Sequence, residues 1–175
     1  NRRSRGLGDV YKRQGQLIVL YILSLKLSIE RGDIDKKNYD INVENLKKLP
    51  GAINSTLKLE SEIQLIAKEF LDAKGSMFLG RGNSFPIALE GALKLKELSY
   101  LHAEGYPAGE MKHGPLALIE EGLPVIVIAP KDKYYEKTLS NMQEVIARGG
   151  KIFFITDNNK RLLSTNIRFR LRAVS

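Results

Sequence analysis

The sequence predicts an α/β fold with three layers, in which helices cover both faces of a mainly parallel sheet. Three short apolar runs carry this prediction: Met77–Leu79, Val125–Ile128 and Ile152–Ile155. A short continuous apolar run is typical of a strand that is buried on both faces of a parallel sheet. Helical segments separate the runs, and a strand–helix–strand order at this spacing indicates βαβ units with right-handed crossovers.

Helical periodicity accounts for most of the remaining chain. The expected helices are Gly15–Arg31, Asn42–Leu57 with an interruption at Pro50-Gly51, Glu60–Lys74, Ile87–Tyr100 and Tyr134–Arg148. We expect a polar linker at Gly32–Tyr39 and a segment punctuated by Gly and Pro at Ala103–Pro115. The tail from Thr165 alternates apolar residues with arginines, which indicates either an edge strand or a frame-shifted, foreign end.

Charge and composition exclude several classes of protein. The net charge is +8, but residues 1–14 carry +4 and residues 158–175 carry +5, which leaves −1 for the rest. A nucleic-acid-binding domain should carry its basic face on the folded body, so we expect no nucleic acid partner. The longest apolar run, Leu17–Leu25, is shorter than the ~18 residues of a membrane span and is expected to be a core helix. The absence of cysteine excludes disulfides and thiolate metal sites, and with no secretory signal we expect a cytoplasmic protein.

The stretch Gly80–Leu118 holds the candidate site. On the predicted helix Ile87–Tyr100, three charged residues (Glu90, Lys94 and Glu97) fall on one stripe with leucines on both sides of it. One interpretation is a ladder of surface ion pairs, each contributing ~0.2–0.5 kcal/mol. The other is a site wall, in which half-buried carboxylates and an amine have shifted pKa values.

The residues around this helix favour a site. Further titratable groups follow it closely, among them both histidines of the chain, His102 and His113. Before it, the turn Gly80–Ser84 feeds a helix N-terminus, where Asn83 or Ser84 is expected to cap the free N–H groups. Such a turn suits a phosphate, but glycines that simply make the turn are the favoured interpretation.

The run FLGRGNSFPIALEGALKLKELSYLHAEGYPAGEMKHGPLALI, with ALEGALKLKE and KHGPLALI nearly unbroken, carries a family resemblance. It resembles the isomerase half of the glutamine–fructose-6-phosphate aminotransferase (isomerising) family. More narrowly, it resembles the second of that family's two sugar isomerase (SIS) domains, a three-layer αβα fold. The resemblance extends from about Gln14 to about Asn166.

The resemblance implies a specific chemistry. The family converts fructose 6-phosphate and glutamine-derived ammonia into glucosamine 6-phosphate, opening the sugar ring, forming an imine and moving a proton between C1 and C2. Glu97 matches the carboxylate base of that transfer, Lys94 a lysine that manages protons and charge on the sugar oxygens, and Glu90 a supporting carboxylate. His113 matches a ring-opening histidine that reaches the site of a neighbouring subunit, which implies a homodimer. No cofactor or metal is implied, and His102 is expected to be a packed or capping residue.

The resemblance also sets domain boundaries. Residues 15–58 match the last helix of the first SIS domain and a linker, and residues 59–175 match the second SIS domain, truncated at its C-terminus. Residues 1–14 do not resemble the family, and because GDVYKRQ looks like translated library-adaptor sequence we interpret them as a non-native end. Nothing after Asn166 matches the family's Schiff-base lysine. The family's glutaminase domain, a partner in the same parent chain, and its Ser/Thr-rich phosphate loop are also unmatched, so we expect an inactive fragment.

Two other functions stay open. SIS domains also serve as non-catalytic sugar-phosphate-binding modules of regulators, which need no carboxylate, lysine and histidine set. This chain has the whole set, which favours the enzyme. A simple sugar-phosphate isomerase without amination is disfavoured only by the length of the motif match.

Overall fold

The computed structural model describes residues 3–157 and 167–172. The chain divides into two compact units, Asn1–Ser55 and Thr56–Ser175. The predicted strands and the candidate site all lie in the second unit.

The first unit consists of two long helices, α1 (Arg3–Glu30) and α2 (Lys36–Leu57). The turn between them contains Gly32 at φ +75°, a conformation that favours glycine, and the Tyr21 hydroxyl donates a 2.8 Å hydrogen bond to the Asn42 side chain. The expected linker at Gly32–Tyr39 is therefore shorter than predicted, and α1 runs without a break through the boundary expected at Gln14.

The predicted interruption of α2 at Pro50-Gly51 is wrong. Helix α2 continues through Pro50, which is exposed. Proline removes one hydrogen bond from a helix, but on a solvated helix water can satisfy the carbonyl that loses its partner.

The second unit is built on a five-stranded sheet with the order β2-β1-β3-β4-β5, in which every pair is parallel. The strands are β1 (Gly75–Gly80), β2 (His102–Pro107), β3 (Pro124–Ile128), β4 (Lys151–Thr156) and β5 (Ile167–Arg172). The parallel pairing of the three predicted strands is confirmed, and the predicted edge strand after Thr165 is β5. Strand β2 was not predicted, because the segment from Ala103 was expected to be irregular.

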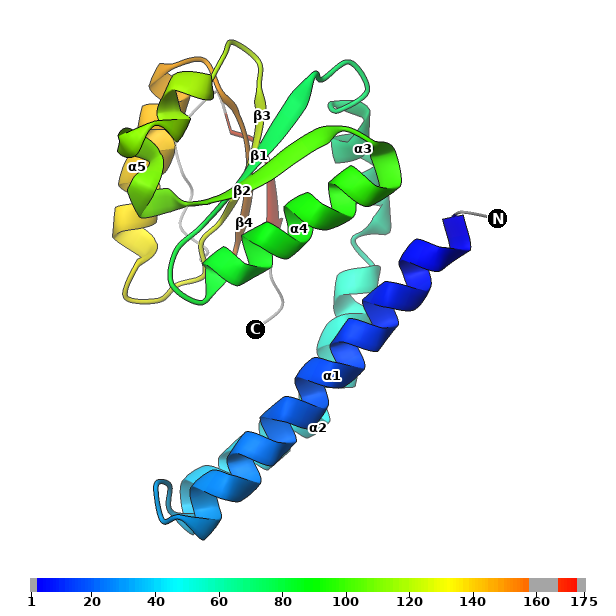
Figure 1. The fold of residues 1–175 in the computed structure, drawn as a ribbon, viewed down its shortest axis with the longest axis vertical. Coiled ribbons are helices and arrows are strands. Elements are labelled where there is room, and N and C mark those ends of the chain that lie inside the picture. The colour runs from blue at the N-terminus through cyan, green and yellow to red at the C-terminus, as the bar shows by residue number, and fades with distance from the viewer. Residues whose placement is uncertain (1–2, 158–166, 173–175) are drawn as a thin grey trace. The chain divides into compact units, whose positions relative to one another are not determined.

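Helices cover both faces of this sheet (Figure 1). Helices α3 (Glu60–Lys68) and α4 (Ser84–Ser99) lie on one face, where Ile66 and Phe70 pack with Phe153. On the other face, α5 (Tyr135–Ala147) and the 3₁₀ turn η1 (Ala108–His113) enclose the main core. Its sheet residues are Met77, Leu79, Val125, Val127, Ile152 and Phe154. The three-layer αβα architecture is confirmed.

Two helix boundaries differ from the prediction. Helix α3 ends at Lys68 rather than Lys74, and turns lead from there to β1. Helix α4 begins at Ser84 rather than Ile87, with Pro86 in its first turn, and its N-cap residue Asn83 makes no side-chain capping hydrogen bond.

Candidate functional site

Helix α4 positions the predicted charged stripe by packing its opposite side on the sheet. Ser84, Ala88 and Ala92 are buried, and a Cβ on Gly91 would lie 2.8 Å from the Phe78 ring. Small side chains let the helix approach the sheet closely. The stripe and its leucines are consequently turned away from the sheet.

Within the stripe, Lys94 and Glu97 form an ion pair. The Lys94 Nζ donates to Glu97 Oε2 over 2.5 Å, with the lysine side chain 20% exposed and the glutamate side chain 43% exposed. Glu90 lies one helical turn before Lys94 and is half-buried. The three residues therefore share one face of one rigid helix, as predicted.

The apolar setting expected around Glu97 is incomplete among the described residues. Leu93 is 40% exposed, Leu98 56% and Ile87 58%. These side chains flank the charged stripe but do not shield it from water. A carboxylate in this position is hydrated on its open side.

His113 is presented by a different layer of the domain. It is the last residue of η1, its side chain is 75% exposed, and its Nε2 lies 4.0 Å from Glu110 Oε2. Ala108 and Met111 of the same turn are buried in the core on the α5 face of the sheet. Because α4 covers the opposite face, the structure does not bring His113 to the Lys94–Glu97 pair through packing within the domain.

His102, which we expect to be a packed or capping residue, is not packed. It begins β2, its side chain is 71% exposed, and its Nε2 lies 3.6 Å from Glu104 Oε1. The Tyr106 hydroxyl donates a hydrogen bond to the other oxygen of Glu104, and this bond, with partial burial, raises the pKa of the Tyr106 phenol. Residues at alternate positions share one face of a strand, so these side chains form a short polar row on β2 that sequence analysis missed.

The Gly-rich turn lies where β1 ends, beside the point at which the strand order reverses between β1 and β3. Its glycines are explained by the turn itself. A Cβ on Gly80 would lie 2.2 Å from the Ser84 carbonyl oxygen, and one on Gly82 would lie 2.5 Å from the Tyr134 ring. Arg81 extends from this turn and donates a 3.4 Å hydrogen bond to Asn141 Oδ1 of α5.

A family model for the SIS domain matches residues 69–174, and this match contains every strand of the sheet. The chain belongs to the SIS domain family.

Two curated relatives of this chain have the same name. The chain is 53% identical over 142 residues to "Glutamine--fructose-6-phosphate aminotransferase [isomerizing]" of Bartonella quintana (strain Toulouse), an alignment that covers 81% of this chain and 23% of the relative. It is 55% identical over 143 residues to the protein of the same name from Mesorhizobium japonicum, covering 82% of this chain and 24% of the relative. The chain thus spans about a quarter of the length of these curated relatives.

A solved structure agrees with both the fold and the relatives. The C-terminal domain of glucosamine-fructose-6-phosphate aminotransferase from Francisella tularensis superposes with a TM-score of 0.86 at 42% sequence identity. The superposition covers 90% of this chain and 45% of that structure.

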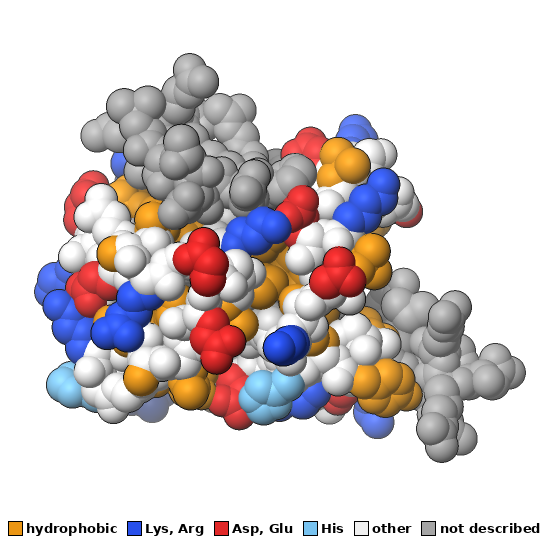
Figure 2. Space-filling model, turned by 90° about the horizontal axis from the view of Figure 1, so that it is seen from above, with side chains coloured by type: hydrophobic (Ala, Val, Ile, Leu, Met, Phe, Trp, Pro, Cys, Tyr) orange, Lys and Arg blue, Asp and Glu red, His pale blue; other side chains and the backbone are white. Residues whose placement is uncertain are grey.

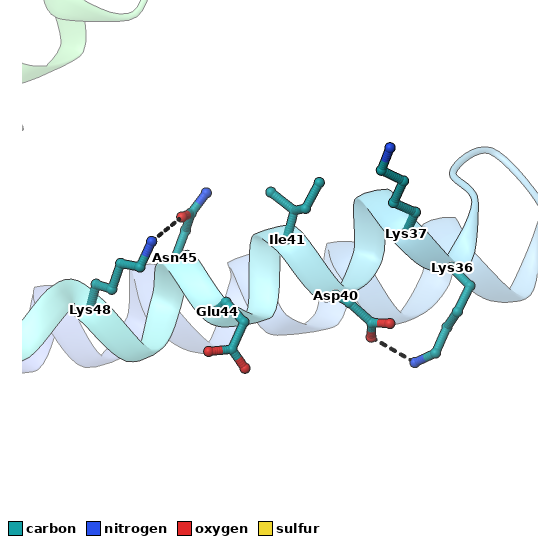
Figure 3. A pocket seen from close by; sticks show the side chains of 7 residues that line it. All are labelled: Lys36, Lys37, Asp40, Ile41, Glu44, Asn45 and Lys48. Carbon is teal, nitrogen blue, oxygen red and sulfur yellow. Dashed lines mark hydrogen bonds and ion pairs between the residues drawn. The ribbon is translucent and has the colours of Figure 1, made fainter.

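Other features of the described surface do not compete with α4 as a site. The hollow drawn in Figure 3 is lined by seven residues of α2 alone, outside the SIS match, and two of them, Lys36 and Asp40, pair with each other at 2.7 Å. A single helix supplies one wall and encloses no ligand. Among the described residues no three His, Cys, Asp or Glu side chains gather as metal ligands, and no described helix is long and apolar enough to cross a membrane.

Charged side chains of both signs lie on the described surface of the chain. Figure 2 shows basic and acidic side chains interspersed over the visible, coloured part of one face, with no continuous basic patch there.

Proposed function

We propose that this chain carries part of the isomerase site of an enzyme that makes glucosamine 6-phosphate from fructose 6-phosphate and glutamine-derived ammonia. The observation that carries the proposal is the Lys94–Glu97 ion pair, which α4 holds on its outward face. The names of relatives above 50% identity support it. Because those relatives are about four times longer, the activity belongs to a longer parent enzyme, and the 175-residue chain alone is expected to be inactive.

In this proposal Glu97 moves the proton between C1 and C2 of the open sugar. General-base catalysis requires a carboxylate within hydrogen-bond reach of the proton, and α4 fixes Glu97 on a rigid element. Lys94, paired with Glu97, donates to the sugar oxygens on which charge develops. Glu90, on the same stripe, supports the positive charge of Lys94 and does not touch the transferred proton.

His113 opens the sugar ring in the site of a second subunit. An imidazole suits this step because histidine side chains in general can both give and take a proton near neutrality. The separation of η1 and α4 into different layers supports a site that is completed across a two-fold interface rather than within one chain. The partner is therefore a second copy of the parent. We place the enzyme in the cytoplasm, because its substrates are sugar phosphates.

The first test is Glu97→Gln in the full-length parent. Glutamine keeps the size of the side chain but cannot accept the proton, so synthesis of glucosamine 6-phosphate should fall ~10²–10⁴-fold while glutamine hydrolysis persists. A matched control is Glu44→Gln, which removes another helical ion pair at i,i+3, between Lys47 and Glu44 at 2.7 Å on α2. Synthesis at a near wild-type rate in Glu97→Gln would overturn the proposal.

The second test addresses the shared site. Two inactive full-length variants, His113→Ala and Glu97→Gln, are mixed under conditions that exchange subunits. Random exchange makes about half of the dimers mixed, and each mixed dimer has one site with both native residues, so about a quarter of all sites should recover activity. If mixed dimers form and stay inactive, His113 acts within its own chain.

The same parent distinguishes the alternative functions. An aminating enzyme requires glutamine or ammonia to consume fructose 6-phosphate at its full rate. Conversion of fructose 6-phosphate to an aldose phosphate with no nitrogen donor requirement would identify a simple isomerase. Binding of the sugar phosphate without turnover would identify a regulatory module.

A further inference from the structure

The turn η1 has little stability of its own, so its orientation depends on what it is attached to. A 3₁₀ turn has poorer hydrogen-bond geometry than an α-helix and rarely extends beyond one or two turns. In this domain Ala108 and Met111 hold one side of η1 in the core, at 0% and 1% exposure. These contacts fix the depth of η1 but leave its outer end, which carries His113, to be oriented by other interactions.

One such interaction lies directly beside His113. The Lys112 Nζ lies 3.0 Å from Glu144 Oε1 of α5, and the side chains are 63% and 29% exposed. Glu144 belongs to a helix that is firmly packed, because Met142 and Val145 of the same helix are 3% and 0% exposed. The ion pair therefore joins the residue preceding His113 to a helix that is packed on the sheet.

The position of Glu144 in α5 favours a cationic partner, and Arg148 at the C-cap of the same helix is a further basic residue close to it in sequence. Glu144 lies in the last turn of α5, and that turn contains no basic residue of its own. The C-terminal end of a helix carries partial negative charge, which disfavours a carboxylate there. Lys112 supplies the compensating positive charge from η1.

We propose that Lys112 is a positioning residue, which orients η1 through Glu144 and so aims His113 at the sugar ring. The proposal rests on the ring-opening role proposed for His113. It goes beyond that role because it assigns a function to an ion pair that contacts no substrate. A half-exposed ion pair contributes only ~0–1 kcal/mol to stability, so Lys112 variants should fold. Their effect should appear instead in the rate, since small misplacements of a reacting group are costly.

The test uses two substrates of the full-length parent. It distinguishes misorientation of His113 from a general loss of enzyme activity. Fructose 6-phosphate closes its ring through the 5-hydroxyl group. The probe 5-deoxyfructose 6-phosphate lacks that hydroxyl and has its 6-oxygen blocked by phosphate, so it stays open and needs no ring-opening histidine. The measured quantity is the ratio of kcat in each variant to wild-type kcat, for each substrate.

We expect Lys112→Ala to lower kcat for fructose 6-phosphate about tenfold, with a smaller change in KM, because the effect falls on orientation and not on substrate binding. Activity with the 5-deoxy probe should stay within about twofold of wild type. Lys112→Glu should be worse than Lys112→Ala, because it faces Glu144 with a like charge. The exchange Lys112→Glu with Glu144→Lys should restore most of the rate. The control Lys151→Ala removes a less exposed ion pair with Glu69, far along the sequence from η1, and should leave the substrate ratio unchanged.

Every other result would contradict the positioning role of Lys112, and each result would do so for a different reason. Equal losses on both substrates would mean that Lys112 is merely structural, and wild-type rates or failure of the charge exchange would mean that the ion pair has no positioning role. His113→Ala, measured in parallel, tests the underlying function. If that variant keeps its activity on fructose 6-phosphate, the ring-opening role falls and the positioning role of Lys112 falls with it.

Discussion

Replacement of Gly105 by alanine should push α4 away from the sheet. Gly105 lies in β2 opposite Phe78 of β1, and a Cβ built on it would lie 2.9 Å from the Leu89 Cα and 3.0 Å from the Leu89 backbone nitrogen. Ordinary contact begins at 3.4 Å, so the two elements must separate by about half an ångström. The Leu89 Cδ2 atom, also at 3.0 Å, could move by a change of rotamer, but the two backbone atoms could not, so no change of side-chain rotamer relieves the whole overlap.

The cost follows from this geometry. Overpacking of a well-packed site costs ~1–3 kcal/mol. Part of it is offset by the lower entropy of the unfolded chain when glycine becomes alanine, ~0.4–1 kcal/mol. We expect a net loss of about 1–2 kcal/mol and, for a chain of this size, a melting temperature lowered by about 2–8 °C.

Two measurements check the prediction. Scanning calorimetry of the chain gives the melting temperature, with Gly75→Ala as the control, because a Cβ on that strand glycine meets only the His102 carbonyl oxygen at 3.4 Å. In the full-length parent, a half-ångström shift of the helix that carries Glu97 should also lower synthesis about 3–10-fold. An unchanged melting temperature for Gly105→Ala would refute the close packing of α4 on β2.

Two further predictions concern η1 and the polar row on β2. Gly114 follows His113 at φ +139°, and a Cβ there would meet nothing within 4 Å, so Gly114→Ala should cost ~1–3 kcal/mol by backbone strain alone, measured by urea unfolding. The hydrogen bond to Glu104 raises the pKa of Tyr106 above 10.0. Its stabilising contribution should therefore be complete below pH 10 and disappear as the pH rises through the raised pKa, and Glu104→Gln should move phenolate absorbance to lower pH. An identical titration in the Glu104→Gln variant would contradict this origin of the shift.

Three of the strands predicted from sequence, β1, β3 and β4, have side chains that are buried on both faces of the sheet. Val125 and Val127 pack on one face of the sheet and Ile126 on the other, so the whole segment is apolar and its pattern is unambiguous. Strand β2 was missed for the opposite reason. It lies at the end of the strand order, and its residues include a histidine, a glutamate, a glycine and a proline. Each is poorly suited to a central strand, and together they resemble a loop.

The residues of β2 are explained by the elements that lie next to this strand in the structure. Gly105 permits the close approach of Leu89, whereas Glu104, on the other face of the strand, accepts a hydrogen bond from Tyr106 of the same strand. A single sequence contains neither the position of α4 nor the edge location of the strand. The contact that requires the glycine was therefore not predictable from local pattern.

Helix α4 illustrates a second limit. Periodicity correctly placed Glu90, Lys94 and Glu97 on one stripe, but it did not decide which side of the helix faces the sheet. Hydrophobicity alone favours the leucine side, whereas the structure buries Ala88 and Ala92, because close helix–sheet packing selects small side chains. The leucines of α4 therefore lie on the side of the helix that faces away from the sheet.

Burial of the alanines places Glu97 on the outward face of α4. There the described part of the chain does not supply the apolar environment that a general base needs. A carboxylate acts best as a general base near neutral pH when an apolar environment raises its pKa. Leucines flank Glu97, yet Leu93 and Leu98 are 40% and 56% exposed, so water still reaches the stripe. The relatives are about four times longer than this chain, and a further part of the parent enzyme that covered this face would bury the leucines and desolvate Glu97 in one step. On the proposed function, assembly of the parent enzyme would then complete the surroundings of its base, and a partly assembled enzyme would leave Glu97 hydrated.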